Sequence, residues 1–279
     1  MNQGRELVLQ FKERIYSEIF QQMHRIGENS FTRERKLTFP IVFSTILKLV
    51  KKSLGIECEL MEPLVVKIPP SKQAFSKARY KICHTGFKEL LELSIETTYR
   101  DPTYGTWRGY RVIDLDGSSL RLPDSQEIVT QFGRFKANAT NGKMCPLARV
   151  SLFVDLCTSM ICSARMAAWD TGEQTLAEEQ LPEVIQQMHN LNHSQLLFIY
   201  DRGYPSLKFI QQHNTLKADF IFRAQERSYT ELWKRVIAGE IDFDCLIKNK
   251  TMAEKIRAIS LTLPSRYACK SQNKHWPTL

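Results

Sequence analysis

The first third of the chain has apolar residues at the spacing of amphipathic helices. Within residues 7–20 the residues that recur at this spacing are Leu7, Phe11, Ile15 and Ile19. GlyGluAsnSer at 27–30 breaks the pattern, and a second helix is predicted over residues 40–54, ended by Gly55. Residues 60–70 read as a connector. The pattern therefore predicts a helical N-terminal region.

Two further helices are predicted after the connector. Ser71 can cap the first of them, in which the residues on one apolar arc are Ala74, Phe75, Ala78 and Ile82. HisThrGly at 84–86 then turns into a helix through Ile95. This helix-turn-helix pattern predicts DNA contacts from the basic side chains of the first helix, which are Lys72, Lys77, Arg79 and Lys81. The alternative, a helical hairpin that binds no nucleic acid, stays open.

After a linker at residues 100–106 the pattern changes to strands. Residues 112–115 and 197–200 are short apolar runs rich in β-branched and aromatic side chains, each stopped by a glycine. The segments between and after them are a strand hairpin at 147–156 and 160–169, a helix at 171–189, a helix at 207–213 and a strand at 219–223. The order predicts an α+β or α/β fold with a mixed sheet, in which the two runs are adjacent strands.

Each of the two apolar runs leads into a carboxylate and then a glycine. Asp116 directly precedes Gly117, and Asp201 lies two residues before Gly203. Carboxylates at the rim of a sheet suit hard cations such as Mg²⁺, which take oxygen ligands. The alternative, that these aspartates only cap turns, is equally compatible with the spacing. Asp114 is the weaker metal candidate because it lies inside the strand.

Three stretches resemble bacterial insertion-sequence transposases of the DDE type. AspGlySerSerLeuArgLeuProAsp at 116–124 and TyrAspArgGlyTyrProSer at 200–206 are similar to the first and second catalytic aspartate motifs of that family. SerLysGlnAlaPheSerLysAlaArgTyrLysIle at 71–82 is similar to a helical segment upstream of the first motif. Their order and separation extend the resemblance over residues 31–225, to the branch whose third acid lies in a Tyr-Arg-Glu-Lys signature.

The resemblance implies an RNase H-like catalytic core and a defined chemistry. Members use divalent metal, Mg²⁺ or Mn²⁺, to hydrolyse DNA at transposon ends and then join the freed 3′-hydroxyl to a target. By position, Asp116 and Asp201 would be the catalytic metal ligands. Arg202 and Tyr204 would be their neighbours, with Arg202 contacting a phosphate because a guanidinium matches phosphate geometry. DNA would be the partner, and we expect a homodimer on it.

The sequence departs from the family pattern after Asp201. Tyr267 is followed by Lys270 and Lys274, where the signature requires Arg and Glu. No signature surrounds the remaining glutamates that could serve, Glu226, Glu231 and Glu254. Residues 265–279 have no apolar period, so we expect a C-terminally truncated copy with an incomplete core and little or no cleavage activity. The alternatives are a DNA-binding regulator or inhibitor without catalysis, and a metal-dependent nuclease without strand transfer.

Composition and charge agree with a DNA-binding region ahead of a catalytic one. The 279 residues carry a net charge of +9, and residues 31–88 hold 12 Lys and Arg against 4 Asp and Glu. Phosphate neutralisation would use such a basic region, although an ordinary solvated surface is the alternative. We expect two domains, 1–105 and 106–279. The chain has neither a membrane-span pattern nor a secretory one, which predicts a cytoplasmic, nucleoid-associated protein with no membrane contact.

The remaining polar residues are predicted to be structural. Seven cysteines without a CxxC pair predict reduced thiols in place of a zinc or disulfide site. His189 and His193 predict a polar helix end. Asp155 within a strand and Asp170 in a turn are predicted to have no catalytic role.

Overall fold

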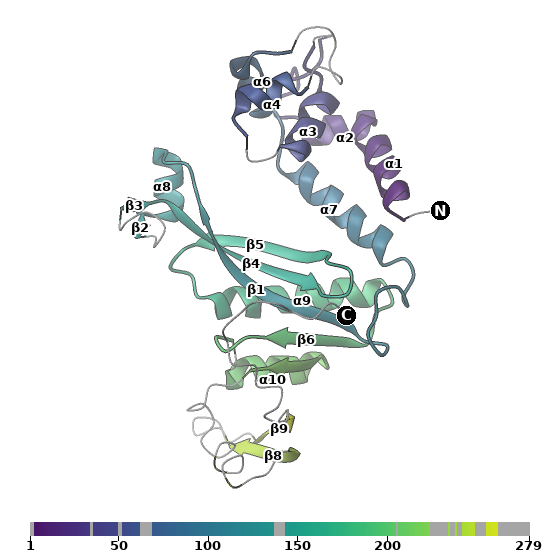
Figure 1. The fold of residues 1–279 in the computed structure, drawn as a ribbon, viewed down its shortest axis with the longest axis vertical. Helices are drawn as coiled ribbons and strands as arrows, with labels where there is room; N and C mark the ends of the chain where they lie inside the picture. Colours follow the sequence, from purple (N-terminus) through teal and green to yellow (C-terminus); the bar gives the residue numbers. More distant parts are fainter. Residues whose placement is uncertain are drawn as a thin grey trace. The chain divides into compact units, whose positions relative to one another are not determined.

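The computed structural model divides into two compact units, Met1–Tyr104 and Gly105–Leu279, drawn in Figure 1. It describes residues 3–33, 36–49, 52–61, 69–136, 143–204, 206–223, 234, 238, 242–248 and 255–261, the last two by their backbone alone. Glu226, Glu231, Glu254 and Tyr267 lie outside the described residues. Among the described helices, none is long and apolar enough to cross a membrane.

The first unit is helical, as the sequence predicts. Its described helices are α1 Gln3–Tyr16, α2 Glu18–His24, α3 Phe39–Lys48, α4 Leu54–Glu59, α6 Lys72–Arg79 and α7 Thr85–Thr98. Aromatic rings from several helices form its core. Phe43 of α3 stacks on Phe87 of α7 with ring centroids 4.2 Å apart, and Phe20 of α2 meets Phe43 edge-on at 5.4 Å. Burial of these rings supplies the apolar area that holds short helices together.

The helix predicted over residues 7–20 is broken in two. Ser17 ends α1 and begins α2, because its hydroxyl accepts a hydrogen bond from the Phe20 amide at 3.3 Å and so acts as an N-cap. Because of this break, α2 buries a different side of the helix from the apolar arc that the sequence predicted. Phe20 is therefore buried at 1% exposure, while Ile19, predicted to face the core, is 68% exposed.

The other helix boundaries in this unit also differ from the prediction. Residues 40–54 do not form one helix, since α3 ends at Lys48 and Gly55 lies inside α4. Gly86 is not in a turn but inside α7, where an added Cβ would lie 2.8 Å from Cε2 of Phe43. This glycine lets α7 approach α3. On α6, Phe75 is buried but Ala74 is exposed, so the apolar arc is narrower than predicted.

The second unit is built on a five-stranded sheet in the order β5-β4-β1-β6-β7. Its strands are β1 Arg111–Arg121, β4 Leu147–Asp155, β5 Ile161–Ala168, β6 Leu196–Tyr200 and β7 Asp219–Phe222. Strand β4 runs antiparallel to both β1 and β5, whereas β1, β6 and β7 are parallel. The predicted fold is thus confirmed: a helical N-terminal region followed by a mixed sheet assembled as strand, hairpin, helix and strand.

Smaller elements complete this unit. They are α8 Gln126–Phe132, β2 Phe135–Lys136, β3 Met144–Cys145, α9 Glu173–Asn190, α10 Leu207–Leu216, β8 Asp242–Lys248 and β9 Lys255–Leu261. Helix α9 packs on β4 and β5, and α10 packs on α9 and β7. Side chains fix this arrangement: Gln180 of α9 donates to the Ser163 hydroxyl of β5 at 3.0 Å, and Arg165 pairs with Glu179 and Glu183.

The two faces of the sheet have different surroundings. Arg165 pairs in register with Ser151, and Ser151 with Gly117, so these residues share the face that α9 covers. Because side chains alternate along a strand, Asp114 and Asp116 point to the opposite face. Apolar side chains on that face are partly open, with Met166 and Leu120 51% and 49% exposed. The acid-bearing face is therefore accessible in the described part of the chain.

A buried ion pair anchors the start of β1. Arg111 and Asp155 are both fully buried, and their side chains are 2.7 Å apart. Asp155 also accepts hydrogen bonds from the amides of Cys157 and Thr158 in the β4–β5 turn, which confirms its predicted structural role. The prediction for His193 was wrong: it is not at a polar helix end but is 4% exposed, with Nδ1 3.4 Å from the Arg111 guanidinium.

Candidate metal-binding site

Asp116 and Asp201 belong to neighbouring parallel strands. The last residues paired between β1 and β6 are Asp114 and Ile199; Asp116 lies two positions further along β1, and Asp201 lies two positions beyond Ile199, directly after β6. Tyr200 points toward α10, where its hydroxyl meets His213, so alternation directs Asp201 to the opposite face. Both aspartates are exposed. The topology thus brings the two sequence motifs to the same end and the same face of the sheet.

Strand β1 does not stop at Gly117, contrary to the prediction from the turn glycine. It continues to Arg121, with Gly117 paired to Ser151 of β4. An added Cβ at Gly117 would lie 3.2 Å from the Tyr204 hydroxyl and 3.0 Å from Cδ of Glu173. The glycine therefore leaves room for two side chains above the strand. Its role is to allow a close approach.

Tyr204 connects the two aspartate motifs. It follows Asp201 by three residues, is buried at 4% exposure, and reaches the β1 backbone at Gly117. Burial raises the pKa of Tyr204, and the carboxylates of Glu173, Asp116 and Asp114 raise it further. The Tyr204 hydroxyl is therefore uncharged, and its contact with Gly117 fixes the loop after β6 against β1.

Asp114 belongs to the same electrostatic group. It is half-buried, two residues before Asp116 and on the same face of β1. Burial raises the pKa of Asp114, as do the charges of Asp116 and, more weakly, Asp201, while the Leu115 amide opposes the shift. Like charges disfavour ionisation of one another. The three carboxylates are thus close enough to repel, and a divalent cation would relieve that repulsion.

Arg223 neutralises Asp201 in this structure. Its guanidinium lies 2.7 Å from Oδ1 of Asp201, and the two side chains are 61% and 67% exposed. The Arg223 amide donates to the Tyr200 carbonyl at 3.1 Å, which fixes the backbone of the residue beside the site. No sequence pattern pointed to Arg223, because the pair joins two loops that only the tertiary structure brings together.

Tyr200, which directly precedes Asp201, is hydrogen-bonded to His213. The Tyr200 hydroxyl and Nε2 of His213 are 2.8 Å apart, and Nδ1 of His213 donates to the Phe209 carbonyl at the same distance. Burial lowers the pKa of His213 to about 4, although the bond to Phe209 opposes the shift. The imidazole is therefore neutral near pH 7, and its Nε2 accepts a hydrogen bond from the Tyr200 hydroxyl. This contact orients the end of β6.

Glu173 was also missed by the sequence analysis. It begins α9 and pairs with Arg149 of β4, whose guanidinium stacks over the Trp169 ring at 4.5 Å. Glu173 contacts the α9 side of Gly117, across the strand from Asp116. An acid at a helix N-terminus is favoured by the helix dipole. Glu173 therefore stabilises the packing of α9.

The donor set suits a hard divalent cation. Asp116 and Asp201 offer exposed carboxylate oxygens on rigid neighbouring strands, and oxygen ligands are those that Mg²⁺ and Mn²⁺ prefer. Within the described residues, no three His, Cys, Asp or Glu side chains already converge as a ready-made metal site. Asp201 is turned to Arg223 instead. The residues fit the ion chemically, and side-chain rotation would be needed to hold it.

In the helical unit, the predicted DNA-contacting cations are all exposed. These are Lys72, Lys77 and Arg79 on α6 and Lys81 directly after it. The turn that follows α6 is attached to the end of α2, since the Ile26 amide donates to the Lys81 carbonyl at 2.7 Å and the Cys83 amide to the His24 carbonyl at 2.8 Å. The basic side chains thus project from a fixed backbone.

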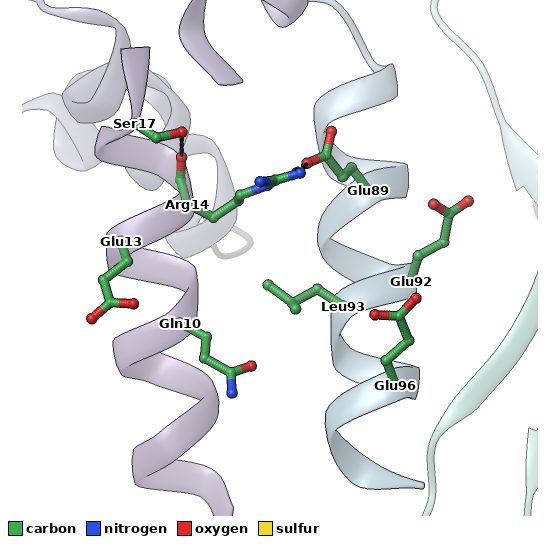
Figure 2. Close-up of a pocket in the computed structure, with 8 residues that line it drawn as sticks. All are labelled: Gln10, Glu13, Arg14, Ser17, Glu89, Glu92, Leu93 and Glu96. Atoms are coloured by element: carbon green, nitrogen blue, oxygen red, sulfur yellow. Dashed lines mark hydrogen bonds and ion pairs between the residues drawn. The ribbon is translucent and has the colours of Figure 1, made fainter. Parts of the chain in front are cut away.

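A groove of about 580 Å³ between α1 and α7 has the opposite charge. Figure 2 shows Glu92 and Glu96 side by side on α7, and Arg14 of α1 reaching across to Glu89. Burial would raise the pKa of Glu89, but hydrogen bonds from His24 and Arg14 keep it below its ordinary value. A groove lined mainly by glutamates repels phosphate. It is therefore unsuited to DNA, unlike the α6 surface.

Comparison with known proteins gives a family match. The model of the family described as Transposase DDE domain matches residues 107–276. Similar solved structures include the piggyBac transposase synaptic complex with hairpin DNA, at 13% identity and TM-score 0.46, covering 97% of this chain and 62% of that one. The Mos1 transposase paired-end complex with the left transposon end has 10% identity, TM-score 0.29 and coverages of 75% and 72%.

A third similar structure is the Drosophila P element transposase strand transfer complex. It has 8% identity and TM-score 0.33, with 91% of this chain and 53% of that chain covered. Comparison with curated protein sequences gives no significant match.

Proposed function

Because this chain belongs to the transposase DDE domain family, we propose that it is a DNA transposase of the bacterial insertion-sequence branch. Its reaction is metal-dependent cleavage of DNA at transposon ends, followed by strand transfer to a target. The observation that carries the proposal is the placement of Asp116 and Asp201 two positions beyond the last paired residues of β1 and β6. DNA is the partner, and a homodimer on two transposon ends is the proposed working form.

Asp116 and Asp201 are the proposed ligands of Mg²⁺ or Mn²⁺. Bound there, the ions supply an activated water and charge stabilisation at the leaving oxygen. The protein supplies position: Tyr204 and Gly117 set the separation of the two motifs, and the Tyr200–His213 contact orients the end of β6. Arg202, exposed beside Asp201, is proposed to hold a DNA phosphate.

DNA affinity is proposed to come from the helical unit. Lys72, Lys77, Arg79 and Lys81 are exposed around α6. Each can neutralise a phosphate and release a counterion. Such contacts are independent of the metal site, so binding and cleavage should respond to different substitutions.

A second candidate is a DNA-binding regulator that occupies transposon ends without cutting them. The observations in its favour are that Asp201 is paired with Arg223 and that, in the described residues, no three His, Cys, Asp or Glu side chains form a ready-made metal site. Such a protein would inhibit transposition by forming inactive complexes.

Cleavage of DNA carrying the ends of its own element, in Mg²⁺ or Mn²⁺, tests the proposal. The transposase proposal expects wild type to cut, contrary to the low activity predicted from the missing third-acid signature, and expects Asp116→Asn and Asp201→Asn to bind the same DNA without cutting. Asp170→Asn is the matched control, because Asp170 is an exposed turn aspartate with no predicted catalytic role. Binding without metal-dependent cleavage by wild type would favour the regulator. Cleavage retained in both aspartate variants would exclude the proposed site.

A further inference from the structure

We propose that the Arg223 guanidinium occupies the Asp201 carboxylate, and that a divalent ion must displace it from Asp201 to bind. The inference rests on the proposed function, since it assigns Asp201 to the metal. The Arg223 guanidinium therefore competes with the metal for the Asp201 carboxylate.

The geometry allows this exchange without disturbing the sheet. Phe222 of β7 pairs with Tyr200 of β6, and the Arg223 amide donates to the Tyr200 carbonyl at 3.1 Å. These backbone contacts hold Arg223 beside Asp201 whatever its side chain does. The guanidinium itself is 61% exposed, so it can leave Asp201 for solvent by rotation of side-chain torsions alone.

Charge explains why a cation is held there. Asp114, Asp116 and Asp201 share one face where the parallel pairing of β1 with β6 ends. Among the ion pairs of the described residues, Asp201 takes part in one, with Arg223, and Asp114 and Asp116 take part in none. Arg223 therefore supplies positive charge that partly offsets the repulsion among the three acids. A divalent ion would supply the same compensation more strongly.

The exposure of the Arg223–Asp201 pair sets how strongly Arg223 should weaken metal binding. Exposed ion pairs contribute about 0.2–1 kcal/mol, which corresponds to about a 1.5- to 5-fold change in an equilibrium constant. Removal of the guanidinium should therefore tighten metal binding by about that factor. The effect is modest because water and salt already screen the pair.

Calorimetric titration of the full chain with Mn²⁺ tests this inference. Arg223→Gln should bind Mn²⁺ about 1.5- to 5-fold more tightly than wild type, and Arg223→Lys should stay close to wild type because it keeps the charge. Arg134→Gln is the matched control: Arg134 pairs with Asp124 on the surface of the same unit, away from the acids, and should leave Mn²⁺ binding unchanged. Asp201→Asn should weaken Mn²⁺ binding in both the wild-type and the Arg223→Gln backgrounds.

Thermal unfolding gives an independent measurement. Without metal, Arg223→Gln should melt slightly below wild type, because the acids repel without compensation, and Mn²⁺ should raise its melting temperature by more than it raises that of wild type. If Arg223→Gln fails to fold, the comparison of wild type with Arg223→Lys and with Arg223→Met keeps the test.

The outcomes separate this inference from the proposed function. Asp201-dependent Mn²⁺ binding in wild type, with equal or weaker binding in Arg223→Gln, overturns the role of Arg223 and leaves the metal site standing. Mn²⁺ binding that appears only after Arg223 is replaced supports the inference strongly. Absence of Asp201-dependent binding in every variant overturns the metal site, and the role of Arg223 with it.

Discussion

In the helical unit, Lys72, Lys77 and Lys81 present their charges at the ends of long flexible side chains, whereas in the sheet unit Asp116 and Asp201 extend one methylene from backbones in fixed register. The two kinds of placement suit different partners. Phosphates along DNA are many and can be met by a mobile ammonium group. A Mg²⁺ ion demands near-ideal octahedral geometry from oxygens that do not move.

This difference predicts which substitutions each unit should tolerate. Phosphate contacts add roughly independently, so the loss of one lysine removes one contact. Metal ligands act together, because an ion with one ligand missing or misplaced no longer stabilises the reaction. Conservative substitutions should therefore be silent around α6 and severe beside β1 and β6. Four predictions follow in decreasing order of effect; the first and the last test this contrast directly, and the other two test the packing inside each unit.

The largest effect is expected from lengthening either aspartate. Asp116→Glu and Asp201→Glu keep the charge but move the carboxylate by a methylene, and displacement of about 1 Å from productive geometry can cost about 100-fold in rate. We expect cleavage in Mg²⁺ to fall at least that far, measured under single-turnover conditions, while DNA affinity stays the same. Lys77→Arg should change neither. Full cleavage by both glutamate variants would show that register does not control this site.

His213 should make the sheet unit sensitive to acid. Burial lowers its pKa from 6.5 to about 4. The unfolded chain therefore binds more protons than the folded chain between these values, and folding stability falls as the pH drops from about 6.5 to about 4. The full shift corresponds to about 3 kcal/mol.

Replacement by glutamine keeps an acceptor for Tyr200 and removes the titration. Denaturant unfolding at several pH values should show a shallower loss of stability in His213→Gln than in wild type over this window. His189→Gln is the control, because His189 is an exposed histidine. Identical pH profiles for wild type and His213→Gln would contradict the buried neutral histidine.

The strands of the sheet unit were predictable because they are apolar runs with clear turn signals, and the run predicted at 197–200 differs from the observed β6, Leu196–Tyr200, by one residue. Adjacency of the strands that carry the two aspartates followed from the order of elements. Helix ends were harder, since a single cap hydroxyl at Ser17 decides whether Ile19 or Phe20 faces the core. The ion pairs of Glu173 and Arg223 join segments that are distant in the sequence, so no local sequence pattern predicts them.

In each unit, a turn predicted from a glycine was wrong, and the reason is the same in both. Gly117 and Gly86 look like turn residues, but each lies inside a regular element where another side chain approaches its Cα. At Gly86 an added methyl would meet the Phe43 ring at 2.8 Å. Gly86→Ala should therefore cost about 1–3 kcal/mol through overpacking, despite the better helix propensity of alanine.

Gly55 provides the matched control for this substitution. It also lies in a helix, but an added Cβ there has open space, with its nearest neighbour 4.0 Å away. Gly55→Ala should be neutral or stabilising by up to about 1 kcal/mol. Urea unfolding of the two variants measures the difference. Equal stabilities would mean that α7 and α3 are packed less closely than the structure indicates.

The smallest effects are expected from single lysines around α6. Lys72→Ala, Lys77→Ala and Lys81→Ala should each leave folding stability within about 0.5 kcal/mol of wild type, because their side chains are exposed. Each should reduce the slope of log affinity against log salt concentration by about 0.9, as expected for one lost phosphate contact. The triple variant should lose close to the sum. Glu92→Gln in the acidic groove is the control and should not lower the slope. Unchanged slopes in all three lysine variants would move DNA binding away from α6.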